Sequence, residues 1–139
     1  MLFRITKRIT ILVLVIFLAS CFPLFEDGSS KLLKNVYNAE KTKKAMVFIN
    51  SGNAVTDNSL HVILENADFE LTGSRLGNVF IVDSDHNSTK LDSNSISLIW
   101  INEKTLEISF DSKVRTFKRA NEVNGVKIVY KEIPVPGDI

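Results

Sequence analysis

This sequence has very little cysteine and histidine and almost no net charge. The 139 residues include one Cys and two His, with 17 Lys or Arg against 16 Asp or Glu. One cysteine cannot form an internal disulfide, and two histidines without Cys-x-x-Cys or His-x-x-x-His spacing argue against a zinc site. The length also excludes a multidomain enzyme.

The small positive charge is concentrated at the N-terminus. Residues 1–20 contain Arg4, Lys7 and Arg8 and no acid, so residues 21–139 hold 17 − 3 = 14 basic and 16 acidic side chains, a net charge of −2. That remainder has no basic excess to neutralise a phosphate backbone. We therefore expect no nucleic-acid partner.

A long hydrophobic run is missing as well. The apolar run 9–18 follows the N-terminal basic residues and precedes the small residues Ala19 and Ser20. A membrane-spanning helix needs roughly 20 apolar residues, which is more than this run provides. The pattern is that of a secretory signal peptide over residues 1–20, with a helical apolar segment.

The residues at the end of this segment indicate its type. Leu18-Ala19-Ser20-Cys21 resembles the lipobox of bacterial lipoproteins. The resemblance implies that the Cys21 thiol receives a diacylglyceryl group, that cleavage occurs between Ser20 and Cys21, and that an N-acyl lipid such as palmitate can follow. Two or three acyl chains hold a protein stably at a membrane, whereas one holds it only marginally.

An uncleaved signal anchor is the alternative, because apolar residues continue through Phe22, Leu24 and Phe25. Pro23 and the polar sequence that follows interrupt that run and favour the lipoprotein. The expected location is the cell envelope, on the outer face of the cytoplasmic membrane or in the outer membrane. By resemblance to enterobacterial lipoproteins, the absence of an acid at Phe22 permits outer-membrane sorting in a host that has one.

We divide the chain into a signal peptide (1–20), a lipid-anchored tether (21–37), a β-rich ectodomain (38–133) and a C-terminal tail (134–139). Residues 26–31 are polar and aperiodic, as expected of a tether. For residues 31–44 the pattern favours a short amphipathic helix and a non-helical segment equally. The lysines at 41–44 suit either contact with anionic lipid or, as we prefer, the solvated edge of a strand.

The ectodomain contains short apolar runs separated by turn residues. The expected strands are 45–49, 59–64, 78–82, 96–101, 106–110 and 126–130. The runs 96–101 and 106–110 predict a hairpin, and Asn124-Gly125 predicts a second tight turn. Pro134 and Pro136 should end the sheet. The fold class is therefore all-β and mainly antiparallel, a small β-sandwich or a partly open barrel.

Aromatic side chains should supply much of its core. These are Phe48, Phe80, Trp100 and Phe110.

Several strand and turn signatures look like those of a family of small bacterial lipoproteins with a β-rich ectodomain. The segments are Asn38-Ala39-Glu40-Lys41, Gly52-Asn53-Ala54-Val55-Thr56-Asp57, Gly77-Asn78-Val79-Phe80, and Trp100 followed by Thr105-Leu106-Glu107-Ile108. The resemblance covers residues 38–130. That family has no agreed activity, so it implies fold and localisation only.

Catalytic patterns are weak. Asp57 and Ser59 lie near His61 in sequence, but neighbouring strand residues alternate faces and no nucleophile elbow is present. We expect His61 at a sheet surface and His86 in a polar loop. Since there is no Gly-rich phosphate loop either, we predict a non-catalytic protein.

The best candidate for a binding site is the polar loop that begins at residue 83. Its oxygen ligands at alternate positions resemble the first half of a calcium loop. The candidate ion-binding residues are Asp83, Asp85, Asn87 and Asp92. Ser88 in place of the required Gly and Asn94 in place of the terminal Glu exclude an EF-hand. A turn rich in Asp, Asn and Ser explains the same residues, and we prefer that interpretation.

Three functions remain open. The default is a non-catalytic module, displayed from the membrane, that binds another envelope protein; an exclusion lipoprotein of a phage or other mobile element is a variant of it. The second is a module that binds a small ligand or calcium. The third is an enzyme, which would need a polar pocket around His61 or His86.

Overall fold

The computed structural model describes residues 28–52 and 56–134. The signal peptide, the lipobox residues Ser20 and Cys21, residues 21–27 of the tether and residues 135–139 lie outside this range. The described residues form strands and turns, and no helix among them is long and apolar enough to cross a membrane. The strands are β1 (Lys31–Tyr37), β2 (Lys43–Asn50), β3 (Ser59–Asn66), β4 (Phe80–Asp83), β5 (Ile96–Asn102), β6 (Thr105–Asp111), β7 (Arg115–Arg119), β8 (Glu122–Val123) and β9 (Val126–Ile133).

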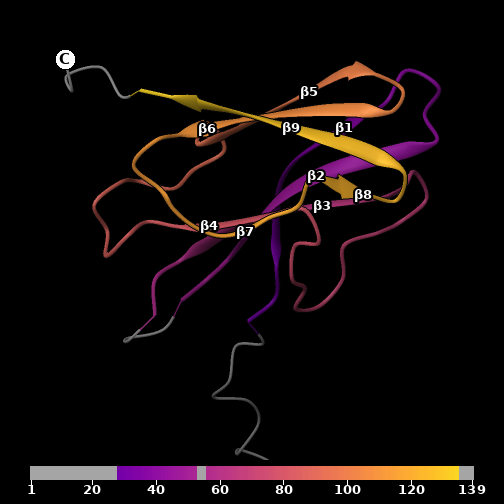
Figure 1. Cartoon of the computed structure of the whole chain (residues 1–139). Helices are drawn as coiled ribbons and strands as arrows, with labels where there is room; N and C mark the ends of the chain where they lie inside the picture. The colour runs from indigo at the N-terminus through magenta and orange to yellow at the C-terminus, as the bar shows by residue number, and fades with distance from the viewer. Residues whose placement is uncertain (1–27, 53–55, 135–139) are drawn as a thin grey trace, which may run out of the picture.

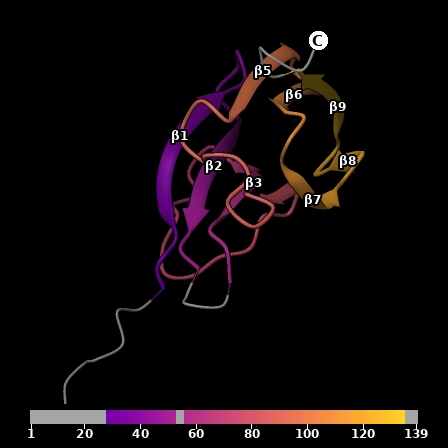
Figure 2. The same ribbon diagram turned by 90° about the vertical axis from the view of Figure 1, so that its left-hand side faces the viewer.

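Two sheets pack face to face, which confirms the predicted β-sandwich. A five-stranded sheet has the order β1-β2-β3-β4-β7, and a four-stranded sheet has the order β5-β6-β9-β8. Figure 1 shows β5, β6 and β9 above β2, β3, β4 and β7, and Figure 2 shows β1, β2 and β3 to the left of β6, β8 and β9. Neighbouring strands are antiparallel except β6 and β9, which are parallel.

The main core lies between the two sheets. Every second residue of the central strands points inward and is buried, as strand geometry requires. The aromatic prediction is confirmed for Phe80 and Phe110, which are 0% and 3% exposed, while Trp100 is partly buried at the edge of the same cluster. Phe80 and Phe110 pack with their ring centroids 4.8 Å apart.

A second, smaller core covers part of the outer face of the five-stranded sheet. Met46, Phe48 and Ile63 are buried there, and Phe69 and Leu71 pack against them. The last two belong to the connection 67–79 between β3 and β4, which we call the cover loop. Because of this loop, β2 and β3 are buried on both faces, and their sequences are correspondingly almost continuously apolar.

The C-terminal part of the predicted tether is wrong: residues 31–37 form the strand β1, and they are neither a tether nor a helix. β1 pairs with β2, and its Leu33 and Val36 pack on the main core. The pairing register shifts between Leu32 and Lys34, which marks a β-bulge at Leu33. The folded region therefore begins near residue 30 and not at residue 38.

The remaining strands agree with the expectations apart from three differences. β4 starts two residues later than predicted, β7 was not predicted at all, and β9 pairs mainly with β6. The turn between β8 and β9 is the expected one, since Asn124 and Gly125 have φ values of 52° and 77°. Lys44 is also not at a solvated edge: it is 7% exposed and donates to the carbonyl of Phe69 in the cover loop.

Side chains link the sheets at both open sides of the sandwich. On one side, Trp100 Nε1 of β5 donates to the Val36 carbonyl of β1 at 3.1 Å, and Lys34 Nζ donates to the Ile96 carbonyl at 2.6 Å. On the other side, the Tyr130 hydroxyl of β9 donates to the Ala120 carbonyl at 2.7 Å. These contacts fix the two sheets relative to each other.

Candidate functional site

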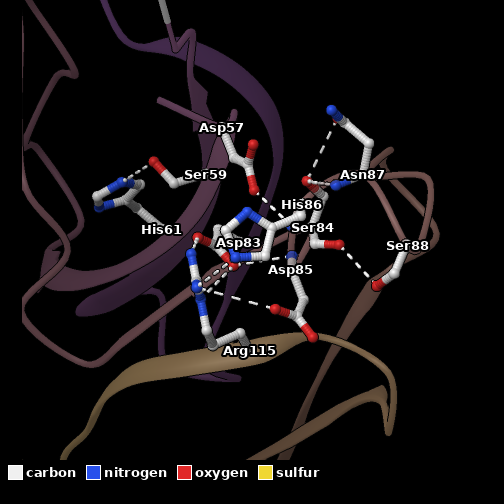
Figure 3. Close-up of polar contacts among 10 residues, drawn as sticks. All are labelled: Asp57, Ser59, His61, Asp83, Ser84, Asp85, His86, Asn87, Ser88 and Arg115. Carbon is white, nitrogen blue, oxygen red and sulfur yellow. Dashed lines mark hydrogen bonds and ion pairs between the residues drawn. The ribbon is translucent and has the colours of Figure 1, made fainter. Parts of the chain in front are cut away.

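The predicted binding loop lies beside a polar pocket on the outer face of the five-stranded sheet. The pocket has a volume of about 360 Å³ and lies next to the part of that face covered by the cover loop. Its lining residues are Thr56, Asp57, Ser59, Ile81, Asp83, His86, Arg115 and Phe117. Strands β3, β4 and β7 thus supply its floor, and the loops at the ends of β3 and β4 supply its rim (Figure 3).

An ion pair between the buried Asp83 and the more exposed Arg115 dominates this pocket. The Asp83 side chain is 8% exposed and accepts from Arg115 Nε at 3.1 Å and from Arg115 Nη2. Its register position on β4 is directly opposite Arg115 on β7. Burial alone would raise the pKa of Asp83, but the hydrogen bonds from Arg115 and from the Asp85 backbone, with the charge of Arg115, lower the pKa below its ordinary value. Asp83 is therefore held as a carboxylate that already has a cation.

The loop that follows is a left-handed turn. Asp85, His86 and Asn87 have φ values of 47°, 58° and 62°. Asp, His and Asn adopt this region more readily than most residues. Asp57 Oδ2 accepts from the His86 backbone N–H at 2.7 Å, and Asn87 N–H donates to the Ser84 hydroxyl at 3.0 Å. The polar groups of the loop are thus largely engaged with one another.

The four predicted ion ligands do not come together. Asp83 is paired with Arg115, Asp85 Oδ1 lies 3.8 Å from Arg115 Nη1, and the Asn87 side chain faces the Ser84 hydroxyl. Asp92 belongs to a separate turn, where it accepts from the Asn94 N–H and lines a different pocket. No group of three or more His, Cys, Asp or Glu side chains in residues 28–52 and 56–134 is arranged to hold a metal ion. The geometry agrees with the preferred interpretation, a turn that satisfies its own backbone.

His61 is buried, which corrects the expectation that it lies at a sheet surface. It is 3% exposed and stacks on Phe48, with ring centroids 5.2 Å apart and planes 16° apart. The cover loop is what buries it, a long-range contact that strand alternation alone does not reveal. Burial lowers the pKa of His61 to about 4, so the ring is neutral at pH 7.

Hydrogen bonds fix the tautomer of that neutral ring. Nδ1 accepts from the Gly77 N–H at 3.1 Å, so the ring proton must be on Nε2. Nε2–H donates a hydrogen bond to the Ser59 hydroxyl oxygen, 2.8 Å away. Asn50 Nδ2 lies 3.3 Å from the same nitrogen but donates to the Arg75 carbonyl at 2.7 Å. The imidazole therefore holds the cover loop in place through Gly77.

This arrangement does not make Ser59 a nucleophile. A catalytic serine needs a base that accepts its proton, and His61 Nε2 already carries one. Asp57 does not orient the ring, since its carboxylate binds the His86 backbone instead (Figure 3). Sequence reasoning did not find the close contact between Ser59 and His61, although residues two apart on a strand share a face.

Arg115 and Gly77 are the structurally decisive residues that the sequence analysis missed. Arg115 belongs to the unpredicted strand β7, and Gly77 lies in the cover loop. The pairing of Asp83 with Arg115 could have been predicted only if the β4–β7 register had been known. No protein-family model matches the chain, and neither a curated protein sequence nor a solved structure gives a match.

Proposed function

We propose that the chain is a lipid-anchored, non-catalytic bacterial lipoprotein whose β-sandwich binds another protein of the cell envelope. The observation that carries this proposal is the sequence Leu18-Ala19-Ser20-Cys21 directly after a short apolar run. It contains the only cysteine of the chain, so no other thiol competes for the lipid. The covalent diacylglycerol, with an N-acyl chain, would hold the protein at the membrane.

The hydrogen bonds and the ion pair around the pocket support the interaction part of the proposal. Ser59 accepts from the buried His61, and Asp83 is paired with Arg115, so the polar groups nearest the pocket are used to build the fold. The surface that remains includes strand edges and loops, together with exposed apolar side chains such as Ile99, Ile101 and Phe117. Those are the features through which β-domains commonly bind proteins.

The anchor is tested with a Cys21→Ala variant in cells fed a labelled fatty acid. We expect the wild type to incorporate label and to be cut, and the variant to carry no label and to remain as the longer precursor. Asn53→Ala, which leaves the lipobox intact, is the control for expression. Continued labelling of Cys21→Ala would overturn the lipoprotein assignment.

The interaction role is tested in the same cells by cross-linking. A tagged wild type and a secreted form without Cys21 are treated in parallel, and the captured proteins are identified. We expect one envelope protein to be recovered specifically with the wild type. Recovery of none would contradict the interaction role, and thermal stabilisation by added calcium would favour the small-ligand alternative.

A further inference from the structure

The C-terminal half of β9 has an unpaired edge. β9 contains residues 126–133, but β8 pairs only with Val126 and Lys127. On the other side, β6 pairs with β9 over positions 127–133. β9 therefore has one edge that faces β6 and one that faces β8. Beyond Lys127, no strand within residues 28–52 and 56–134 pairs with the edge that faces β8.

The backbone groups along this edge point outward. Lys127 N–H donates to the Lys104 carbonyl, on the β6 side, whereas Ile128 N–H donates to the Asn121 carbonyl, on the β8 side. Successive backbone N–H and C=O groups alternate between the two sides of a strand. The N–H and C=O groups of Tyr130 and Glu132 are therefore directed to the open edge. The chain that would otherwise cover them turns toward the other sheet at Ala120, whose N–H donates to the Val79 carbonyl.

The charge on the outer face of this strand is basic. Lys127 and Lys131 lie on that face and are exposed. β8 places Glu122 directly opposite Lys127, so the chain itself supplies an acid where this edge is paired. Lys131 has no such neighbour, and it forms no ion pair with any residue of the described ranges.

From these contacts we propose that the edge of β9 at residues 130–133 binds an extended, acidic segment of a partner protein, which continues the line of β8. The partner strand pairs with the outward backbone groups of Tyr130 and Glu132 and places an acid opposite Lys131, as Glu122 is opposite Lys127. This inference rests on the interaction role proposed above, not on the lipid anchor. A second copy of the chain fits less well, because the symmetric register that uses both outward pairs brings Lys131 opposite itself.

The test uses the full-length protein in detergent and a fluorescein-labelled peptide of alternating Glu and Val residues. Binding is measured by fluorescence anisotropy. Two peptides serve as controls: one with Lys in place of Glu, and the acidic peptide with alternate peptide bonds N-methylated. We expect only the unmodified acidic peptide to bind, because N-methylation removes the donors that pair with the strand edge.

A matched pair of variants isolates the backbone contribution. Glu132→Pro removes an N–H that faces the open edge and leaves the bonds to β6 in place. Glu132→Ala keeps that N–H but removes the carboxylate, which lies 3.5 Å from Arg119 Nη1. We expect Glu132→Pro to weaken peptide binding at least about fivefold relative to Glu132→Ala, with a melting temperature that shows both variants folded.

The charge is tested with Lys131→Glu. We expect this variant to bind the acidic peptide about fivefold more weakly and to gain affinity for the basic one. Equal binding by Glu132→Pro and Glu132→Ala, or binding of the N-methylated peptide, would overturn the proposal. A wild-type dimer that Glu132→Pro dissociates would assign the edge to self-association instead. The peptide-binding measurement does not depend on lipidation of Cys21, so a negative labelling experiment would not change its result.

Discussion

A single imidazole determines how part of the outer sheet face is covered. His61 lies under the cover loop, donates to Ser59 and accepts from the Gly77 backbone. A protonated ring would lose its acceptor and would place a charge in an apolar site next to Phe48. The neutral imidazole is therefore part of the folded structure, and its titration is coupled to stability.

The free energy of unfolding should depend on pH through His61. Its pKa is about 4 when folded and near 6.5 when unfolded, so below pH 6.5 the unfolded chain binds a proton that the folded chain does not. Stability should fall as the pH decreases from 6.5 to 4. The shift sets an upper limit of about 3 kcal/mol, and with solvent screening we expect about 1–2 kcal/mol.

Urea denaturation at pH 7.5 and pH 4.5 measures this loss. The matched variant is His61→Gln, whose amide can accept from Gly77 and donate to Ser59 but does not titrate. We expect the wild type to lose more stability than the variant between these pH values. Equal losses would show that His61 is not the titrating group. The Asp83 carboxylate, whose pKa is lowered, should contribute only at more acidic pH.

At the scale of single residues, the sequence predicted inward-facing positions well but polar partners poorly. Phe80 and Phe110 follow strand alternation and are buried as expected. His61 is an exception, because the cover loop lies over it through Gly77, sixteen residues further along the chain. Asp83 is another, since its charge depends on an arginine that only the sheet register brings near.

At the scale of elements, the strands missed by the sequence analysis have identifiable causes. The bulge at Leu33 breaks the alternation of β1, so its apolar residues take a spacing typical of a helix. A helix this short is marginal in water, whereas the strand gains a hydrogen-bonded partner and packs Leu33 and Val36 on the core. β7 has the sequence Arg115-Thr116-Phe117-Lys118-Arg119, which lacks any apolar alternation because it lies at an edge.

The cover loop depends on one close backbone approach. A Cβ at Gly77 would lie 2.7 Å from the Val62 carbonyl oxygen and 2.9 Å from the Phe80 carbonyl oxygen. Since both are backbone atoms, the loop must shift. We expect Gly77→Ala to lower the free energy of unfolding by about 1–3 kcal/mol and to weaken the contact with His61.

Thermal denaturation and limited proteolysis of residues 67–79 measure this effect. Gly28→Ala is the control, because a Cβ at Gly28 meets no atom within 4 Å. We expect the control to melt like the wild type and the Gly77→Ala loop to be cut faster. A Gly77→Ala variant as stable and as resistant as the control would contradict the close approach.

At the scale of the whole molecule, sequence patterning gave the sandwich and its approximate size but not the boundary of the folded region. The boundary matters because β1 closes one side of the sandwich. Lys34 and Val36 exchange hydrogen bonds with β5 across the two sheets. A truncation at the predicted boundary would remove these bonds together with a whole edge strand.

Two N-terminal truncations test that boundary. A chain that starts at residue 28 should melt cooperatively at a temperature close to that of the full protein, because it keeps β1, its pairing with β2 and its packing on the core. A chain that starts at residue 38 should be strongly destabilised or unfolded, because it exposes the edge of β2 and the core beneath Leu33 and Val36. The near-ultraviolet circular dichroism of Trp100 follows both. Cooperative melting of the shorter chain would show that β1 is dispensable.

The order of strands in the four-stranded sheet also constrains when the protein can fold. β9 is the last strand of the described residues, yet it lies between β6 and β8 and supplies Val126 and Ile128 to the core. Until those residues leave the ribosome, the centre of that sheet is missing, and the earlier strands have nothing to close against. The complete core between the two sheets can therefore form only after β9 has been made. A chain of this topology therefore remains without a closed core during most of its synthesis.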